Sequence, residues 1–272
     1  MAAEAWDPFA DPAEGPEVAA GAAAVEAAAG AGGGGARWYA GKPVVEGRRL
    51  RVAVLHGVAS NAAIAKMQLA ALARLGRDRL ELLVVPGREP AEDEGNADIL
   101  RMRQLFPGQE LLWYARGDTG VPDIIGDYAD IDGAIAYLQA QLRQRAPVDG
   151  VLGFSQGSNL AAVLAAQAVA GQGEQLAFAV HICTTSTGWQ ERWPDLFREP
   201  LRLPSLHIWG RHDEVVGCDG TYVRQGQELP QIYLASETGS HSGGHRPLPE
   251  GRAEAEELAA RLLAFMERAA AA

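Results

Sequence analysis

The sequence predicts an α/β fold, in which helices flank a mostly parallel, doubly wound sheet. Apolar runs of strand length alternate with segments of helical spacing along most of the chain. These runs are nearly continuous in apolar residues, as in strands buried on both faces of a parallel sheet. One of them, 151–154, stops at the tight turn Gly153-Phe-Ser-Gln-Gly157 and is followed at once by a segment of small apolar residues. Strand, sharp turn and helix are therefore joined without a long connection.

The composition predicts one large domain that follows an acidic tail. Residues 1–36 are rich in Ala, Gly, Glu and Pro, and they contain six acids and no Lys or Arg. We expect them to be disordered. The whole chain has a formal net charge of -11. Residues 37–272 contain 24 basic and 29 acidic residues, which gives them a net charge of -5. A chain of this length with 47% hydrophobic residues can bury a sizeable core. Residues 37–272 are predicted to form that domain.

Several function classes are disfavoured. No basic stripe suggests a nucleic-acid partner, and no apolar run approaches the roughly 20 residues of a membrane span. The N-terminus has acids where a targeting peptide has bases, so we expect a cytoplasmic protein. Cys183 and Cys218 are too few for a disulfide framework and are expected to be reduced thiols. Neither a metal cluster nor a phosphate-binding loop is visible, and Gly32–Gly35 follows no strand, so no cofactor or metal is predicted. The oligomeric state is left open.

The elements can be assigned in order. Each strand is a short apolar run ended by Gly, Pro or a polar cluster, and each helix carries apolar residues at spacings of three and four. We expect strands at 50–55, 80–85, 151–154, 175–183, 204–209 and 231–235. We expect helices at 64–75, 98–106, 128–143, 159–166, partly at 216–228, and at 253–268. The stretches 88–130 and 184–203 are irregular and are candidates for pocket walls, and 237–249 is expected to be all loop.

The turn around Ser155 has the pattern of the nucleophile elbow of α/β-hydrolases, G-x-S-x-G between a strand and a helix. Gly153 and Gly157 are expected where a Cβ would collide, and Ser155 is expected at the tip, strained and with its hydroxyl exposed. The same pattern also arises by chance in a chain with 32 glycines. The presence of catalytic partners in the right chain order is what separates the two interpretations.

An activated serine needs a base, and that base needs an orienting acid. In α/β-hydrolases the chain order is Ser, acid, His. The acid and the histidine each come directly after a strand. Asp213 and His245 meet this condition and are the predicted acid and base. Other polar residues are alternatives for these roles. Glu214 and Asp219 are alternatives for the acid, and His241, His212 and His56 are alternatives for the base. His241 is the strongest of these, and His56 is expected to brace a loop.

A hydrolytic serine also needs two N–H groups aimed at the oxyanion. The backbone N–H of Gln156, at the start of the elbow helix, is predicted to be one. The second should come from the loop after the first strand, His56-Gly57-Val58, and Val58 is preferred, with Ala59 behind it. The alternative interpretation of this loop is an ordinary glycine turn.

Four pieces resemble the FSH family of serine hydrolases: Leu55-His-Gly57, Gly150-Val-Leu-Gly-Phe-Ser-Gln-Gly157, Gly210-x-x-Asp213-x-x-Val216 and His241-x-Gly-Gly-His245. The family's last motif continues to a proline where this chain has Leu248, flanked by Pro247 and Pro249. The resemblance covers about residues 50–268. It implies an α/β-hydrolase with little or no lid, in which Ser155 is the nucleophile, Asp213 the acid and His245 the base.

The expected activity is hydrolysis of carboxylic esters or thioesters, with small-molecule acyl substrates, through an acyl-enzyme intermediate. The carboxylesterase/acyl-protein thioesterase family shares G-F-S-Q-G and is the family most easily confused with this one. Two alternatives stay open: a non-catalytic ligand-binding module of the same fold, and an acyltransferase that passes the acyl group to an alcohol or carrier.

Overall fold

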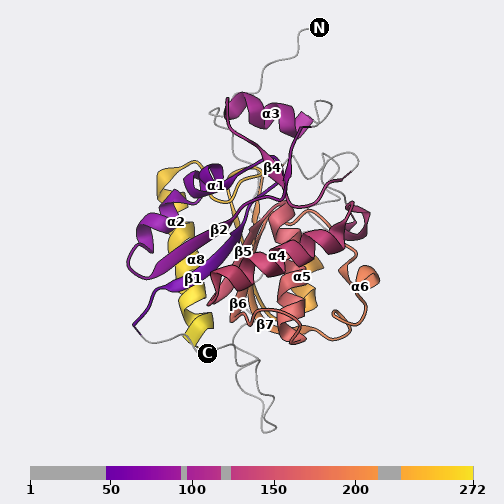
Figure 1. Cartoon of the computed structure of the whole chain (residues 1–272). Helices are drawn as coiled ribbons and strands as arrows, with labels where there is room; N and C mark the ends of the chain where they lie inside the picture. Colours follow the sequence, from indigo (N-terminus) through magenta and orange to yellow (C-terminus); the bar gives the residue numbers. More distant parts are fainter. Residues whose placement is uncertain (1–46, 93–96, 118–123, 214–227, 272) are drawn as a thin grey trace. The chain divides into compact units, whose positions relative to one another are not determined.

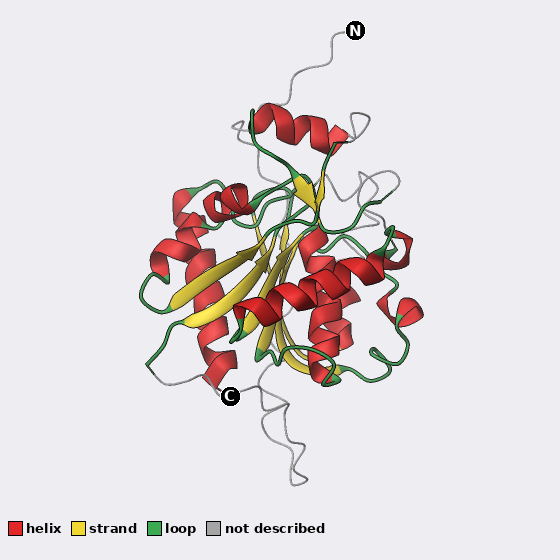
Figure 2. Ribbon diagram, in the orientation of Figure 1, coloured by secondary structure: helices red, strands yellow, loops and turns green. Residues whose placement is uncertain are grey.

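Six parallel strands form the central sheet of the computed structural model, in the order β2-β1-β5-β6-β7-β8 (Figures 1 and 2). The structure describes residues 47–92, 97–117, 124–213 and 228–271. The strands of the sheet are β1 (Leu50–Leu55), β2 (Leu80–Val85), β5 (Gly150–Phe154), β6 (Phe178–Ile182), β7 (Leu201–Gly210) and β8 (Tyr233–His241). Chain order and spatial order reverse beside β1, so the described sheet is doubly wound, as the sequence predicts.

Helices cover both faces of this sheet (Figure 1). On one face, α4 (Ile131–Arg145) and α5 (Gln156–Val169) share a core cluster with strand residues that include Ala53 and Leu55. On the other face, α2 (Ala70–Leu75) and α8 (Arg252–Ala271) pack on residues that include Val52 and Val54. Successive residues of one strand thus enter opposite cores, because side chains alternate along a strand. Burial on both faces explains why the sequences of these strands are nearly continuous in apolar residues.

A smaller group of elements follows β2 and precedes α4 in the chain. The strands β3 (Glu89–Pro90) and β4 (Leu112–Trp113) pair antiparallel, and α3 (Ala97–Leu105) lies between them in the chain. Figure 1 shows α3 beyond the end of the sheet, next to this short ribbon. A separate apolar cluster holds the group together: Ala59, Ile64, Ala91, Ile99, Leu111 and Trp113. Ala59 lies in the loop after β1, and Ile64 lies in α1 (Ala62–Gln68). This cluster therefore packs the group against that loop and against α1.

Two element predictions need correction. The single helix expected at 64–75 is divided into α1 and α2 at Leu69, whose φ of -101° and ψ of 16° are not helical. The last strand is longer than expected, because β8 pairs with β7 as far as Gly210↔His241. The polar sequence from Glu237 to Ser240 conceals this pairing, since an edge strand needs no apolar residues on its solvated side. The predicted helix at 216–228 and the tail at 1–36 lie outside the described residues.

Short 3-10 helices and one short α-helix complete the described elements: η1 (Ile125–Asp127), α6 (Trp189–Arg192) and η2 (Leu229–Ile232). Within the described part of the chain, none of the helices has both the length and the apolar character required to cross a bilayer.

Candidate active site

Ser155 lies at the turn between β5 and α5, in a backbone conformation that few residues other than glycine adopt. Its φ is 53° and its ψ is -123°. A Cβ at Gly153 would lie 2.4 Å from the carbonyl oxygen of Gly157, and one at Gly157 would lie 2.1 Å from that of Leu55. The first glycine therefore allows the turn to close, as predicted. The second allows the turn to pack against the end of β1, a reason the sequence did not indicate. Backbone strain of this kind costs about 1–3 kcal/mol and marks functional turns.

The expectation that the Ser155 hydroxyl is exposed is wrong, because only 2% of the residue's surface is accessible. The loop after β1 lies directly against it. A Cβ at Gly57 would be 3.2 Å from the Cβ of Ser155 and 3.1 Å from the ring of Phe154. The elbow therefore packs directly against this loop.

Asp213 and His245 come together although 32 residues separate them in the chain. The Nδ1–H of His245 donates to both carboxylate oxygens of Asp213, at 2.8 Å and 3.0 Å. The side chain of Asp213 is 4% exposed and that of His245 is 12% exposed. This contact fixes the imidazole tautomer with its proton on Nδ1, so that the Nε2 lone pair is free to accept a proton.

The His245 ring also contacts the elbow. Its centroid lies 5.0 Å from the centroid of the Phe154 ring, the residue just before Ser155. Among the described residues, no hydrogen bond joins His245 to the hydroxyl of Ser155. The structure thus pairs the predicted acid with the predicted base directly, and places that base beside the elbow through Phe154.

Glycines let the two loops meet. A Cβ at Gly210, the last residue of β7, would lie 2.2 Å from the carbonyl oxygen of Gly244, and one at Gly244 would lie 3.0 Å from that of His212. The backbone N–H of His212 donates to the carbonyl of Gly243 at 3.2 Å. Gly210 and Gly244 therefore allow the close approach of the two loops. Leu248, at the position of the expected proline, is buried in the core beneath α8.

His241 has other partners. It is 1% exposed at the end of β8, its Nε2 lies 3.0 Å from the carbonyl oxygen of Arg246, and its Nδ1 accepts from the Gly243 N–H at 3.1 Å. The bond from the Nε2–H to Arg246 stabilises the loop that carries His245. Burial lowers the pKa of the His241 side chain. His212 is exposed, and Glu214 and Asp219 lie outside the described residues.

The loop after β1 contains Val58, the predicted donor to the oxyanion. Val58 follows Gly57, and Ala59 next to it has a positive φ of 50°, an uncommon conformation for a residue with a side chain. The loop is fastened to β4 by two hydrogen bonds between Ser60 and Leu112, at 3.2 Å and 2.8 Å. Within the described ranges, the N–H groups of Val58 and Gln156 have no acceptor, so both are available to a ligand.

The Gln156 side chain has a role that the sequence pattern did not indicate. It accepts from the Tyr114 N–H at 2.8 Å and donates to the Ala115 carbonyl at 2.7 Å. The Tyr114 hydroxyl in turn accepts from the His56 N–H at 3.0 Å and donates to the carbonyl of Val85 at 2.7 Å. The His56 ring lies 2.8 Å from the Gly57 carbonyl oxygen through Nδ1, and its burial lowers its pKa to about 4. Buried hydrogen bonds therefore connect both predicted donor loops.

Asn159 was also missed. Its side chain is fully buried in α5 and makes hydrogen bonds with the chain after β6. The side-chain oxygen accepts from the N–H groups of Thr185 and Ser186 at 3.0 and 3.1 Å, and the amide donates to the hydroxyls of the same two residues at 2.8 Å each. The motif pattern gave no sign of this role, because position 159 lies beyond the pentapeptide.

Cys183 was expected only as a reduced thiol, and the sequence did not place it near the predicted acid and base. It directly follows β6, has a φ of 49° and is 3% exposed. Its Sγ, a carboxylate oxygen of Asp213 and a ring nitrogen of His245 all lie within 4.8 Å of one another. Burial, with Asp213 nearby, raises the pKa of the thiol well above its usual value. The expectation of a reduced thiol agrees with this setting, but the proximity to the acid and base depends on the fold alone.

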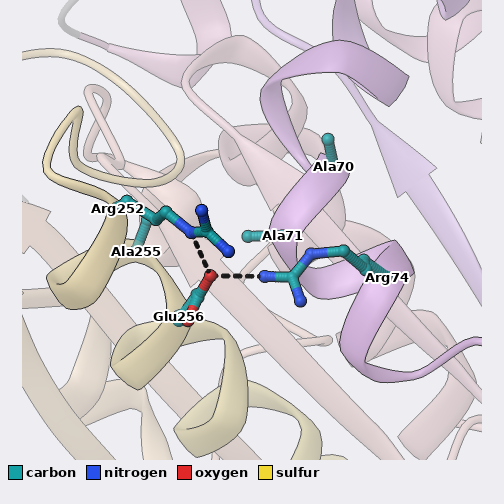
Figure 3. A pocket seen from close by; sticks show the side chains of 6 residues that line it. All are labelled: Ala70, Ala71, Arg74, Arg252, Ala255 and Glu256. Atoms are coloured by element: carbon teal, nitrogen blue, oxygen red, sulfur yellow. Dashed lines mark hydrogen bonds and ion pairs between the residues drawn. The ribbon is translucent and has the colours of Figure 1, made fainter.

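A pocket of about 280 Å³ lies between α2 and α8 (Figure 3). Figure 3 shows Arg74 and Arg252 both pointing toward Glu256, which accepts from them at 2.7 and 2.9 Å. None of the predicted site residues lines this pocket, and its charged groups already bind one another. It offers no reactive group.

Comparison with known proteins supplies a family. A family model described as "Serine hydrolase (FSH1)" matches residues 46–257. The protein named Esterase OVCA2 from Homo sapiens is 27% identical over 210 residues, which cover 73% of this chain and 89% of that protein. The protein named Esterase FUS5 from Gibberella fujikuroi is 27% identical over 182 residues, with 66% of this chain and 71% of that protein covered.

Solved structures agree on the fold. SOBER1 of Arabidopsis thaliana matches with a TM-score of 0.55 at 14% identity, over 81% of this chain and 99% of that one. An esterase named PE8 matches with a TM-score of 0.55 at 18% identity, over 83% and 98%. At these identities the likeness is one of fold, and it supports the predicted α/β-hydrolase architecture.

Proposed function

The chain belongs to the FSH1 serine hydrolase family, and from this premise we propose that it cleaves carboxylic esters or thioesters of small acyl compounds. Ser155 is the nucleophile, His245 the general base and Asp213 the orienting acid. The observation that carries the assignment is the pair of hydrogen bonds from His245 Nδ1 to Asp213, beside a strained elbow serine. A purely structural role for Ser155 would not require a strained backbone, a paired acid and base, and free N–H donors, all at the carboxyl ends of the strands.

The first step is acylation. Nε2 of His245 accepts the hydroxyl proton as Ser155 Oγ bonds to the carbonyl carbon, and Asp213 stabilises the imidazolium that forms. The oxyanion accepts from the N–H groups of Val58 and Gln156. His245 then gives its proton to the leaving alcohol or thiol. In the second step, water loses a proton to His245 as its oxygen bonds to the acyl carbon. The bond from that carbon to Ser155 Oγ then breaks, His245 returns the proton to Oγ, and the carboxylic acid is released.

The hydroxyl and Nε2 must meet for this chemistry. A hydrogen bond between nucleophile and base is often long in a ligand-free site and shortens when substrate binds. The His245 side chain is 12% exposed and that of Asp213 is 4% exposed, so the imidazole is the partner that is open to an incoming substrate.

A panel of acyl esters and thioesters of graded chain length tests this proposal. The wild-type protein should hydrolyse some of them, and Ser155→Ala should lower kcat by about 10⁴–10⁶-fold, or roughly 5–8 kcal/mol of barrier. Near-full activity in Ser155→Ala would refute the role of the serine. Activity only when an acceptor alcohol is present, with none toward water, would identify an acyltransferase instead.

A further inference from the structure

Three side chains of different metal-binding types converge next to the elbow. Cys183 contributes a thiol from the end of β6, Asp213 a carboxylate from the loop after β7, and His245 an imidazole from the loop after β8. Their donor atoms lie within 4.8 Å of one another. Thiolate, imidazole and carboxylate are all common ligands of zinc in proteins. The proposed hydrolytic chemistry uses the last two residues and leaves the thiol without a role.

We propose that Cys183, Asp213 and His245 form an inhibitory site for a zinc-like divalent cation. The metal takes the position of the proton between His245 Nδ1 and Asp213, with Cys183 Sγ as the third ligand and water as the fourth. Binding is a property of these three side chains; the claim that binding inhibits rests on the function proposed above.

The distances fit this arrangement with small movements. Tetrahedral zinc has bonds of about 2.0–2.2 Å to N and O and about 2.3 Å to S, which place its ligand atoms roughly 3.4–3.7 Å apart. The N···O distance between His245 and Asp213 is 2.8 Å, so this pair would have to open by less than about 1 Å. The Sγ, within 4.8 Å of both, would have to approach by about 1 Å. The thiol makes a weak hydrogen bond to the carbonyl oxygen of Arg246 at 3.7 Å, which metal binding would break.

The charges also balance. A divalent cation with one thiolate, one carboxylate and a neutral imidazole has no net charge, which suits a site whose side chains are 3–12% exposed. The metal binds the thiolate form of Cys183, so the thiol must lose its proton. On binding, the thiol proton passes to solvent and the sulfur electron pair bonds to the metal. One proton is released for each ion bound.

Binding would block catalysis through the tautomer of His245. With Nδ1 bonded to the metal, the imidazole proton moves to Nε2, where it becomes a donor. The lone pair that has to accept the Ser155 proton is then occupied. Inhibition therefore does not require the ion to contact the substrate, and excess substrate should not reverse it.

Cobalt(II) is a suitable probe, because its bond to a thiolate has a charge-transfer absorption that bonds to N and O ligands lack. We expect this band when Co²⁺ is added to the full-length wild type, to Ser155→Ala and to Cys218→Ser. We expect no band with Cys183→Ser or with Cys183→Ala. Cys218 is the other cysteine of the chain and serves as the matched control. Circular dichroism establishes that each variant is folded.

Inhibition is measured separately. Zn²⁺ should lower wild-type ester hydrolysis, and the concentration for half inhibition, referred to each variant's own metal-free rate, should rise at least about tenfold in Cys183→Ser. No thiolate band in the wild type, or a band that survives in Cys183→Ser, would overturn the site. Because Ser155→Ala is inactive by the proposed function but keeps all three ligands, its Co²⁺ band reports on the site even if the hydrolase assignment fails.

Discussion

Nδ1 of His245 donates to the carboxylate of Asp213 at 2.8 Å, across two loops that follow different strands of the sheet. This bond orients the imidazole and selects its tautomer. The carboxylate is the more deeply buried partner, so it also supplies the negative charge that would stabilise an imidazolium.

Asp213→Asn tests the role of that charge. The amide is nearly the same size, but it can donate to Nδ1 and favour the wrong tautomer, so kcat should fall by about 10³–10⁴-fold. The melting temperature, followed by circular dichroism, should change little by comparison. A variant that keeps activity within tenfold of the wild type would show that Asp213 is not the orienting acid.

Gly210→Ala tests the packing of the two loops. The new Cβ would lie 2.2 Å from the backbone oxygen of Gly244, so the loop carrying His245 must move away. We expect a loss of about 1–3 kcal/mol in the free energy of unfolding, together with reduced kcat. Gly251→Ala is the matched control, because nothing lies within 4 Å of its added Cβ. Equal stability of the two variants in urea denaturation would contradict this packing.

Asn159→Ala should cost stability through unpaired backbone groups. Loss of the amide leaves the buried N–H groups of Thr185 and Ser186 without their acceptor, which costs about 1–3 kcal/mol for each unsatisfied group. Gln144→Ala, on the exposed face of α4, should stay within about 0.5 kcal/mol of the wild type. Denaturant titration of both variants measures the difference. A loss for Asn159→Ala no greater than for the control would rule out a structural role for this network.

Stability should fall as the pH drops below the ordinary histidine pKa of about 6.5. Burial lowers the pKa of His56 to about 4 and of His181 to about 3, and it lowers the pKa of His207 as well. Above that pH, folded and unfolded states are both neutral at these positions. Between about pH 6.5 and 4 the unfolded chain binds protons that the folded protein excludes, so each group lowers stability by up to about 1.4 kcal/mol per pH unit.

The comparison of variants isolates this contribution from that of the carboxylates. Urea denaturation at pH 7.5 and pH 5 should show a smaller difference for His207→Asn than for the wild type. The exposed His212, changed to Gln, should leave the difference unchanged. If His207→Asn and His212→Gln respond to pH alike, buried neutral histidines do not account for acid destabilisation.

The fold could be predicted because its inner strands, such as β5, are buried on both faces. Apolar runs such as Val151–Phe154 signal such strands directly, and the glycines at 153 and 157 locate the turn. The predicted range of the edge strand β8 ended too early, because residues 237–240 are polar. Its pairing with β7 depends on backbone hydrogen bonds, which sequence patterns do not record. The break at Leu69 has no local signal in the sequence either, since leucine is a good helix former.

The site was predictable only where chain order carries information. Ser155, Asp213 and His245 follow strands in the order expected of this fold, so they could be named. Cys183 and Asn159 could not, because their partners lie in other loops and no spacing rule connects them. The burial of Ser155 also depends on the approach of the loop at Gly57, which is a tertiary contact.

Labelling of Ser155 by a fluorophosphonate tests the central claim most directly, since this reagent bonds to a serine only when a neighbouring base activates it. Peptide mass spectrometry of the labelled wild type should place the adduct on Ser155, and His245→Gln and Asp213→Asn should label far more slowly under the same conditions. No adduct on Ser155 in the wild type, or labelling that is equally fast in His245→Gln, would contradict the account.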